Sequence, residues 1–209
     1  MKPQRIIALS LVLMLSIFLT NSGLSQTTGD TVKKTSVKLF YVYSDKGVKN
    51  SNFFAPSGWL GDYADLTFKA DCSDNPYAGS TCIKITYRSK ASGGTRWAGI
   101  YWQNPANNWG DIKEAGVNLT GIKRLTFWAR GEKGDERIEE FKIGGINGLY
   151  PDSDTAKIGP LLLTTQWKQY TIELTGKNLS HIIGGFAWSA NLENNSNGCT
   201  FYLDEIRYE

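Results

Sequence analysis

The sequence predicts an all-β protein in which two antiparallel sheets pack face to face as a β-sandwich. Short runs of β-branched and aromatic residues alternate with Gly, Asn, Asp and Pro, which is typical of strands joined by turns. Within the runs, apolar and polar side chains alternate, as with Leu125 and Phe127 against Thr126 and Trp128. Beyond residue 25 no stretch carries a convincing helical stripe. Each strand therefore has one core face and one polar face, as a sandwich needs.

The same pattern places the individual strands. Each candidate is bounded by turn residues, and loops of varied length join them. The candidates are Val37–Tyr43, Asp65–Ala70, Cys82–Ser89, Trp97–Gln103, Arg124–Arg130, Glu139–Gly144, Gln166–Leu174, Ile183–Trp188 and Thr200–Tyr208.

The first 25 residues have the pattern of a secretory signal peptide. Lys2 and Arg5 precede the almost wholly apolar stretch Ile6–Thr20, and the small residues Gly23 and Ser25 precede a cleavage point. A membrane anchor is the rival interpretation, but a spanning helix needs about 20 apolar residues. We expect a signal peptide over 1–25, a flexible leader over 26–36 and one domain over 37–209. The mature chain would then be secreted or periplasmic, without a membrane span.

Charge gives little indication of a charged partner. The whole chain carries a formal charge of +3, which falls to +1 without Lys2 and Arg5. Nucleic-acid binding needs a concentrated basic surface, so no nucleic-acid partner is expected.

Three cysteines remain, at Cys72, Cys82 and Cys199. Cys72 and Cys82 flank a loop rich in turn residues, and export permits a disulfide between them. The alternative is three unrelated thiols. Cys199 is left over, and three Cys with one His do not make a zinc pattern.

The segment from Gly94 to Gly110 is rich in aromatic and amide side chains. If Ile100 points into the core, Trp97, Tyr101 and Gln103 share the outer face. A flat aromatic ring covers the apolar patch of a sugar, and amides bond its hydroxyls; ligand sites generally combine such apolar walls with a few polar groups. Trp97, Tyr101, Gln103, Asn107 and Trp109 supply that mixture. The alternative for any one Trp is burial in the core.

Three segments together resemble successive strands of jelly-roll carbohydrate-binding modules of the galactose-binding-like superfamily. They are Leu125–Gly131, Gln166–Leu174 and the closing Phe201–Ile206, and they come in the family's order. The resemblance implies a jelly roll whose outer sheet face holds a polysaccharide or oligosaccharide. It also implies that Trp128, Arg130 and Lys142 lie on the same face as Trp97.

A calcium site is a further implication of the resemblance. In that family an acidic residue of the closing strand often ligates structural calcium, and Tyr43–Gly47 matches an acidic turn after the first strand. Asp45 and Asp204 are the candidate Ca²⁺ ligands, because the first and last strands of a jelly roll can lie side by side. Calcium prefers six to eight oxygen ligands. The alternatives are a salt bridge from Asp204 to Arg207 or a Lys, and an exposed turn at Asp45.

These observations predict a non-catalytic carbohydrate-binding domain. An exported structural or adhesive protein that self-associates is the main alternative, and a glycoside hydrolase is a weaker one. His181 is the only His, and no nucleophile motif accompanies it. Carboxylates that a glycosidase would need fall in 131–137, which reads as a solvated turn.

Overall fold

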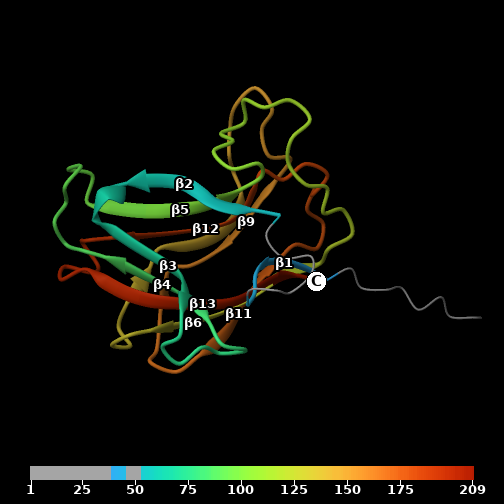
Figure 1. Cartoon of the computed structure of the whole chain (residues 1–209). Coiled ribbons are helices and arrows are strands. Elements are labelled where there is room, and N and C mark those ends of the chain that lie inside the picture. The colour runs from blue at the N-terminus through green and yellow to red at the C-terminus, as the bar shows by residue number, and fades with distance from the viewer. Residues whose placement is uncertain (1–38, 46–52) are drawn as a thin grey trace, which may run out of the picture. The chain divides into compact units, whose positions relative to one another are not determined.

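The structure, a computed structural model, describes residues 39–45 and 53–209 and is built from β-strands (Figure 1). The predicted signal peptide, the whole predicted leader and the first two residues of the first predicted strand lie outside these residues. No helix in the described ranges is long and apolar enough to cross a membrane. The strands are β1 (Phe40–Tyr43), β2 (Ala55–Gly61), β3 (Leu66–Cys72), β4 (Cys82–Tyr87), β5 (Trp97–Gln103), β6 (Arg124–Gly131), β7 (Arg137–Ile138), β8 (Glu140–Gly144), β9 (Thr155–Ile158), β10 (Leu161–Leu162), β11 (Lys168–Glu173), β12 (Gly184–Asn191) and β13 (Cys199–Tyr208), with a 3-10 turn, η1, at Tyr63–Asp65.

Two antiparallel sheets form the sandwich. Sheet A has the order β11-β6-β13-β4-β3, with β1 also paired to β13, and sheet B has the order β2-β5-β12-β8-β9. Strands β7 and β10 form a separate short pair. Figure 1 shows the two sheets as stacked layers, with sheet B uppermost. The predicted all-β sandwich is confirmed.

Aromatic side chains from both sheets fill the space between the layers. The Phe127 ring of sheet A lies 4.7 Å from Phe141 and 5.3 Å from Phe186 of sheet B, between ring centroids. Trp188 of sheet B meets Phe201 of sheet A at 4.9 Å. These rings are nearly or fully inaccessible to solvent. Each buries a large apolar area and makes tilted or edge contacts that aromatic pairs prefer.

The predicted strands coincide with β1, β3, β4, β5, β6, β8, β11, β12 and β13 within a few residues at their ends. The prediction missed β2, β7, β9 and β10. Strand β2 contains Pro56, Ser57 and Gly58, which are poor strand formers, and its register shifts between Pro56 and Gly58. It pairs on one side only, and proline is tolerated on such an edge strand.

A bulge in β13 changes which side chains face the core. The register against β6 shifts between Asp204 and Arg207, and Glu205 has a positive φ of 46°. One extra residue reverses the alternation, so that Leu203 and Ile206 are both fully buried. The two adjacent carboxylates of the closing strand therefore mark the bulge.

The loop over 88–96 leads into β5 and is held by two buried carboxylates, Asp62 and Asp65. Asp62 accepts hydrogen bonds from the backbone N–H groups of Thr95 and Arg96, at 3.0 and 2.9 Å. Asp65 accepts bonds from the hydroxyl and backbone N–H of Ser92, at 2.6 and 2.8 Å, and these two bonds lower its pKa. The carboxylates thus fix the loop that precedes β5.

This arrangement predicts acid-sensitive stability. A carboxyl group whose pKa is lowered by folding stabilises the protein above its unfolded pKa of about 4, and that contribution is lost as the pH falls through the folded value. The Asp65→Asn variant should be less stable than the wild type at pH 7, and the difference should shrink as the pH falls below about 4. Urea unfolding at pH 7 and pH 3 measures this, with the exposed Asp135→Asn as control. A difference that stays constant with pH would contradict it.

Candidate functional site

The outer face of sheet B, the face turned away from sheet A, carries the predicted aromatic residues of β5. Trp97, Gly99 and Tyr101 point outward there, while Ala98, Ile100 and Trp102 are buried in the core. The register places Leu60 and Ser189 on either side of Gly99. Because Gly99 has no side chain, no β5 side chain stands between Trp97 and Tyr101 along this strip of the face.

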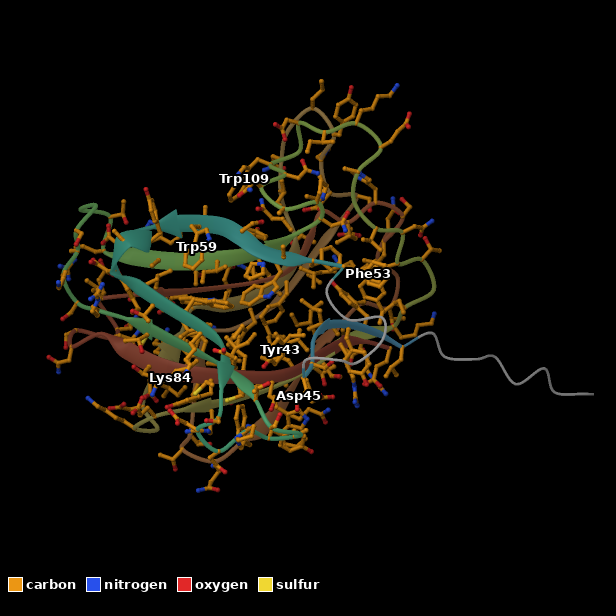
Figure 2. The ribbon with its side chains drawn as sticks, viewed as in Figure 1. Tyr43, Asp45, Phe53, Trp59, Lys84 and Trp109 are labelled. Atoms are coloured by element: carbon orange, nitrogen blue, oxygen red, sulfur yellow. The ribbon has the colours of Figure 1, made fainter. Side chains whose placement is uncertain are left out.

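Two tryptophans are the exposed rings of this face. Trp97 is 37% exposed and Trp109 is 40% exposed, whereas Tyr101 is only 4% exposed. The Trp109 ring meets Tyr101 edge-on, at 6.0 Å between centroids. In Figure 2, Trp109 lies above β2, on the side of sheet B away from sheet A. Trp97 packs closely over Gly61, whose φ of +63° suits glycine.

Gln103 fixes the loop that carries Trp109. Its Nε2 donates to the carbonyl of Asn108 at 2.7 Å, and its Oε1 accepts from the Ser57 hydroxyl at 2.8 Å. The same hydroxyl accepts from the backbone N–H of Asn107, also at 2.8 Å. Gln103 is fully buried, so it positions the loop, whereas the Asn107 side chain is exposed. The expectation that Gln103 offers its amide at the surface is wrong, because both ends of that amide are bonded internally.

A small apolar cluster lies beneath the Trp109 loop on the outer face. It contains Tyr101, Ile146, Ile183 and Ala187. Asp152 ties the segment that follows β8 to this cluster by accepting bonds from the backbone N–H groups of Ile146 and Ile183. Burial raises the pKa of Asp152, and these bonds partly offset the increase. The loops beside Trp109 are therefore attached to the sheet.

Charged groups on this face are paired. Lys142 Nζ lies 3.1 Å from Glu140 and 5.0 Å from the centre of the Tyr101 ring, and Lys157 lies 3.3 Å from Glu140. Burial lowers the pKa of Lys142, but its contacts with Tyr101 and Glu140 outweigh burial and raise the pKa overall. Lys142 is thus held as a charged donor beside the aromatic rings.

Trp128 and Arg130 lie on the other sheet. Both point outward from β6, the sheet A strand that pairs with β13 and β11. Trp128 is stacked on Tyr77 at 3.6 Å, and the Arg130 guanidinium lies 3.6 Å from the Tyr202 ring centre. The expectation that they share a face with Trp97 is wrong, because β5 and β6 belong to different layers. Alternation gave the correct outward direction but could not assign the sheet.

Asp45 and Asp204 both hold the loop over 73–81, which joins β3 to β4. Asp45 accepts bonds from the backbone N–H groups of Ser80 and Thr81 and from both hydroxyls. Asp204 accepts backbone N–H bonds from Tyr77, Ala78 and Glu205, at 2.9, 3.2 and 2.8 Å.

This donor set does not fit a calcium ion. Each of the four carboxylate oxygens already accepts a hydrogen bond, and calcium requires six to eight oxygen ligands. The described residues contain no group of three or more His, Cys, Asp or Glu that could hold a metal. Calcium at Asp45 and Asp204 remains an untested prediction that this geometry does not favour.

The sequence analysis did not identify three residues that lie on the outer face of sheet B, two polar and one apolar. Asn191 lies opposite Trp97, Ser189 lies opposite Glu140, and Leu60 lies on β2. The predicted strand ended at Trp188, whereas β12 continues to Asn191. Extending its alternation by three residues would have placed Ser189 and Asn191 beside the tryptophans.

A hollow of about 370 Å³ lies elsewhere, between the loops over 132–136 and 194–198. Its lining is mostly polar, and its one aromatic residue, Tyr87, is fully buried. A sugar has no ring to stack on there, so the sheet B face is the better candidate.

The Gln103 bonds generate a prediction. Replacing Gln103 with Leu keeps a similar volume but leaves the Asn108 carbonyl without its donor, and leaves the Ser57 hydroxyl only the longer bond to the Ala55 carbonyl, at 3.2 Å. Loss of such buried partners costs about 1–3 kcal/mol. We expect Gln103→Leu to lower the free energy of unfolding by that amount, measured with urea, and to loosen the Trp109 loop. The exposed Gln166→Leu is the matched control and should change stability little; equal stability of both variants would contradict the role of Gln103.

Comparison with known proteins identifies the fold. No protein-family model and no curated protein matches the chain. The crystal structure of a family 30 carbohydrate-binding module is similar to this chain, with a TM-score of 0.55 and 14% sequence identity. The alignment covers 83% of this chain and 88% of the module. The family 30 module of a cellulosomal cellulase from Clostridium thermocellum is also similar, with a TM-score of 0.54 and 14% sequence identity. That alignment covers 80% of this chain and 95% of the module. The chain therefore has the jelly-roll fold of carbohydrate-binding modules.

Proposed function

We propose that this protein is a non-catalytic domain that binds a neutral polysaccharide or oligosaccharide on the outer face of sheet B. The observation that carries the proposal is the pair of exposed tryptophans, Trp97 and Trp109, on a strand and loop fixed by internal hydrogen bonds. Rings held in place lose little freedom on binding, which favours affinity.

The spacing of the rings suits a chain of sugars. Trp97 and Tyr101 are four residues apart on β5, or about 13 Å along a strand, and the Trp109 ring stands against Tyr101. A ligand that touches both tryptophans must be longer than one sugar ring. Ser189, Asn191 and Lys142 share this face by register, and the exposed Asn107 belongs to the Trp109 loop; these side chains would supply donors and acceptors for hydroxyl groups.

Charge pairing favours a neutral ligand. Lys142 and Lys157 both approach Glu140, so the face presents no concentration of one sign. The similar structures named above are binding modules, which agrees with a role without catalysis. Together with the predicted signal peptide, this suggests that the domain acts outside the cytoplasm, where polysaccharides are met.

Binding measurements with the two tryptophan variants test the proposal. The mature chain should bind at least one glycan in an array of soluble β-glucans, xylans and mannans. Trp97→Ala and Trp109→Ala should each weaken that binding by about tenfold or more, because a buried aromatic side chain contributes about 1.5–3 kcal/mol. Leu162→Ala, also an exposed apolar residue, is the control and should bind normally. No hit in the array, or unchanged affinity in both tryptophan variants, would reject this site.

We also propose that Cys72 and Cys82 form a disulfide in the exported protein. Both are free thiols in the structure, but they lie directly opposite each other in the β3–β4 pair. Opposite residues of antiparallel strands have Cα atoms about 4.5–5.5 Å apart, within the range for a disulfide. Burial raises the pKa of Cys82 to about 12, so the thiolate needed for oxidation is scarce once the fold has formed.

Peptide mapping tests the disulfide. Protein recovered from an oxidising compartment should yield linked Cys72 and Cys82 peptides without reductant, and Cys199 should remain unlinked. Folded reduced protein should form the bond slowly, because both thiols are buried. Free thiols at both positions in freshly exported protein would contradict it.

A further inference from the structure

The outer face of sheet A carries a second aromatic group, on the opposite side of the sandwich from Trp97 and Trp109. The loop over 73–81 leaves β3, folds back across that face and returns to β4, and the Tyr77 ring comes to lie on Trp128 of β6. Trp167, just before β11, meets the Tyr77 ring edge-on at 6.3 Å. In Figure 2, Lys84 of sheet A and Asp45 lie on the side of the molecule opposite Trp109.

One face of the Tyr77 ring is open. The Tyr77 and Trp128 rings are nearly parallel, at 14° with centroids 3.6 Å apart, so Trp128 covers one side of the tyrosine. Tyr77 is nevertheless 43% exposed, more than either tryptophan of the sheet B face. The exposed ring is therefore a flat surface backed by a second ring.

The loop over 73–81, which carries Tyr77, is fixed by hydrogen bonds that do not involve the tyrosine ring. Asp204 accepts hydrogen bonds from the backbone N–H groups of Tyr77 and Ala78. Asp45 accepts hydrogen bonds from those of Ser80 and Thr81. On the other flank, Arg130 Nη2 donates to the Asp74 carbonyl at 2.7 Å, and Trp167 Nε1 donates to the Asn75 carbonyl at 2.9 Å. Backbone bonds at both flanks hold the loop, so an exposed aromatic ring at its tip is not required for its shape.

The surroundings of Tyr77 suit a neutral sugar. Lys84 is shared between Asp74 at 3.4 Å and Glu132 at 3.8 Å, so charges of opposite sign lie together. Gln169 is exposed and lies opposite Trp128 in the β11–β6 pair, where its amide can reach a ligand above the rings. An exposed ring with nearby amide and paired charges repeats the chemistry of the sheet B face.

We propose that Tyr77, backed by Trp128 and flanked by Trp167, is a second stacking platform for the same neutral polysaccharide. One domain would then hold two chains on opposite faces and cross-link them. This inference rests on the proposed function for its ligand, but it concerns different residues on a different sheet.

Titration with cello-, xylo- and mannohexaose tests the second platform. For the hexaose that binds, calorimetry should give two sites per chain. Tyr77→Ala should leave one site, Trp97→Ala/Trp109→Ala should leave the other, and Tyr77→Phe should keep both because the ring is retained. Tyr63→Ala removes a tyrosine of η1 that is more exposed than Tyr77, at 58%; it is the control and should keep two sites.

Two further readouts test the same platform, and the first needs only the wild type. In the wild-type NMR spectrum, indole N–H signals of Trp128 and Trp167 should shift on adding the hexaose, alongside those of Trp97 and Trp109. The wild type should also aggregate the matching soluble polysaccharide, measured by light scattering, and Tyr77→Ala should not.

The outcomes separate the two proposals. One site, with Trp128 and Trp167 signals unmoved and binding lost in the Trp97 and Trp109 variants, would overturn the second platform and leave the sheet B site standing. Binding lost only in Tyr77→Ala would overturn the sheet B site and support the platform. No binding to any hexaose or to the array would overturn both.

Discussion

The pairing of β13 with three other strands is the constraint on which sheet A depends. Its first half pairs with β4, its end pairs with β1, and β6 runs along its other side. The bulge at Glu205 keeps both carboxylates of this strand out of the core, because Asp204 faces outward after Leu203 and the extra residue brings Ile206 back into the core. Tyr208 then donates its hydroxyl to the Gly185 carbonyl of β12, which joins sheet A to sheet B at the end of the chain. Both candidate faces belong to sheets that this strand aligns.

Buried and half-buried carboxylates that accept backbone N–H bonds recur in the described part of this molecule. Asp62 and Asp65 hold the loop before Trp97, Asp152 holds the loops under Trp109, and Asp45 and Asp204 hold the loop that carries Tyr77. Charge-assisted bonds of this kind are stronger than neutral ones and satisfy polar groups that a turn would otherwise bury. Exposed aromatic rings consequently stand on loops of defined shape. An acidic residue in an apolar strand can therefore indicate a loop anchor as well as a metal ligand.

Local sequence patterns predicted most strands well, because the alternation of apolar and polar side chains follows directly from which face of a strand is buried. The predicted strand Trp97–Gln103 has the same bounds as β5. Phe127, Phe141 and Ile172 face the core, as the alternation predicted. The sequence could not reveal which strands share a sheet, because that depends on contacts between residues far apart in the chain. Trp128 and Trp97 both alternate outward, yet they lie on opposite layers. The hidden role of Gln103 has the same origin, since its partner Ser57 belongs to a strand whose Pro and Gly concealed it.

The difference between the two faces follows from how each ring is supported. On sheet B, Trp97 stands on a strand and Trp109 on a loop, and no β5 side chain stands between Trp97 and Tyr101, so the proposed ligand would lie along this strip and meet both tryptophan rings. On sheet A the strip is occupied by the chain's own loop, and Arg130 and Tyr202 beneath it are already in contact with each other. Tyr77, at the outer side of this loop, is the ring that we propose for a ligand on sheet A. The longer strip on sheet B should therefore discriminate between polysaccharides of different shape, whereas a single backed ring should accept any sugar with a flat apolar face.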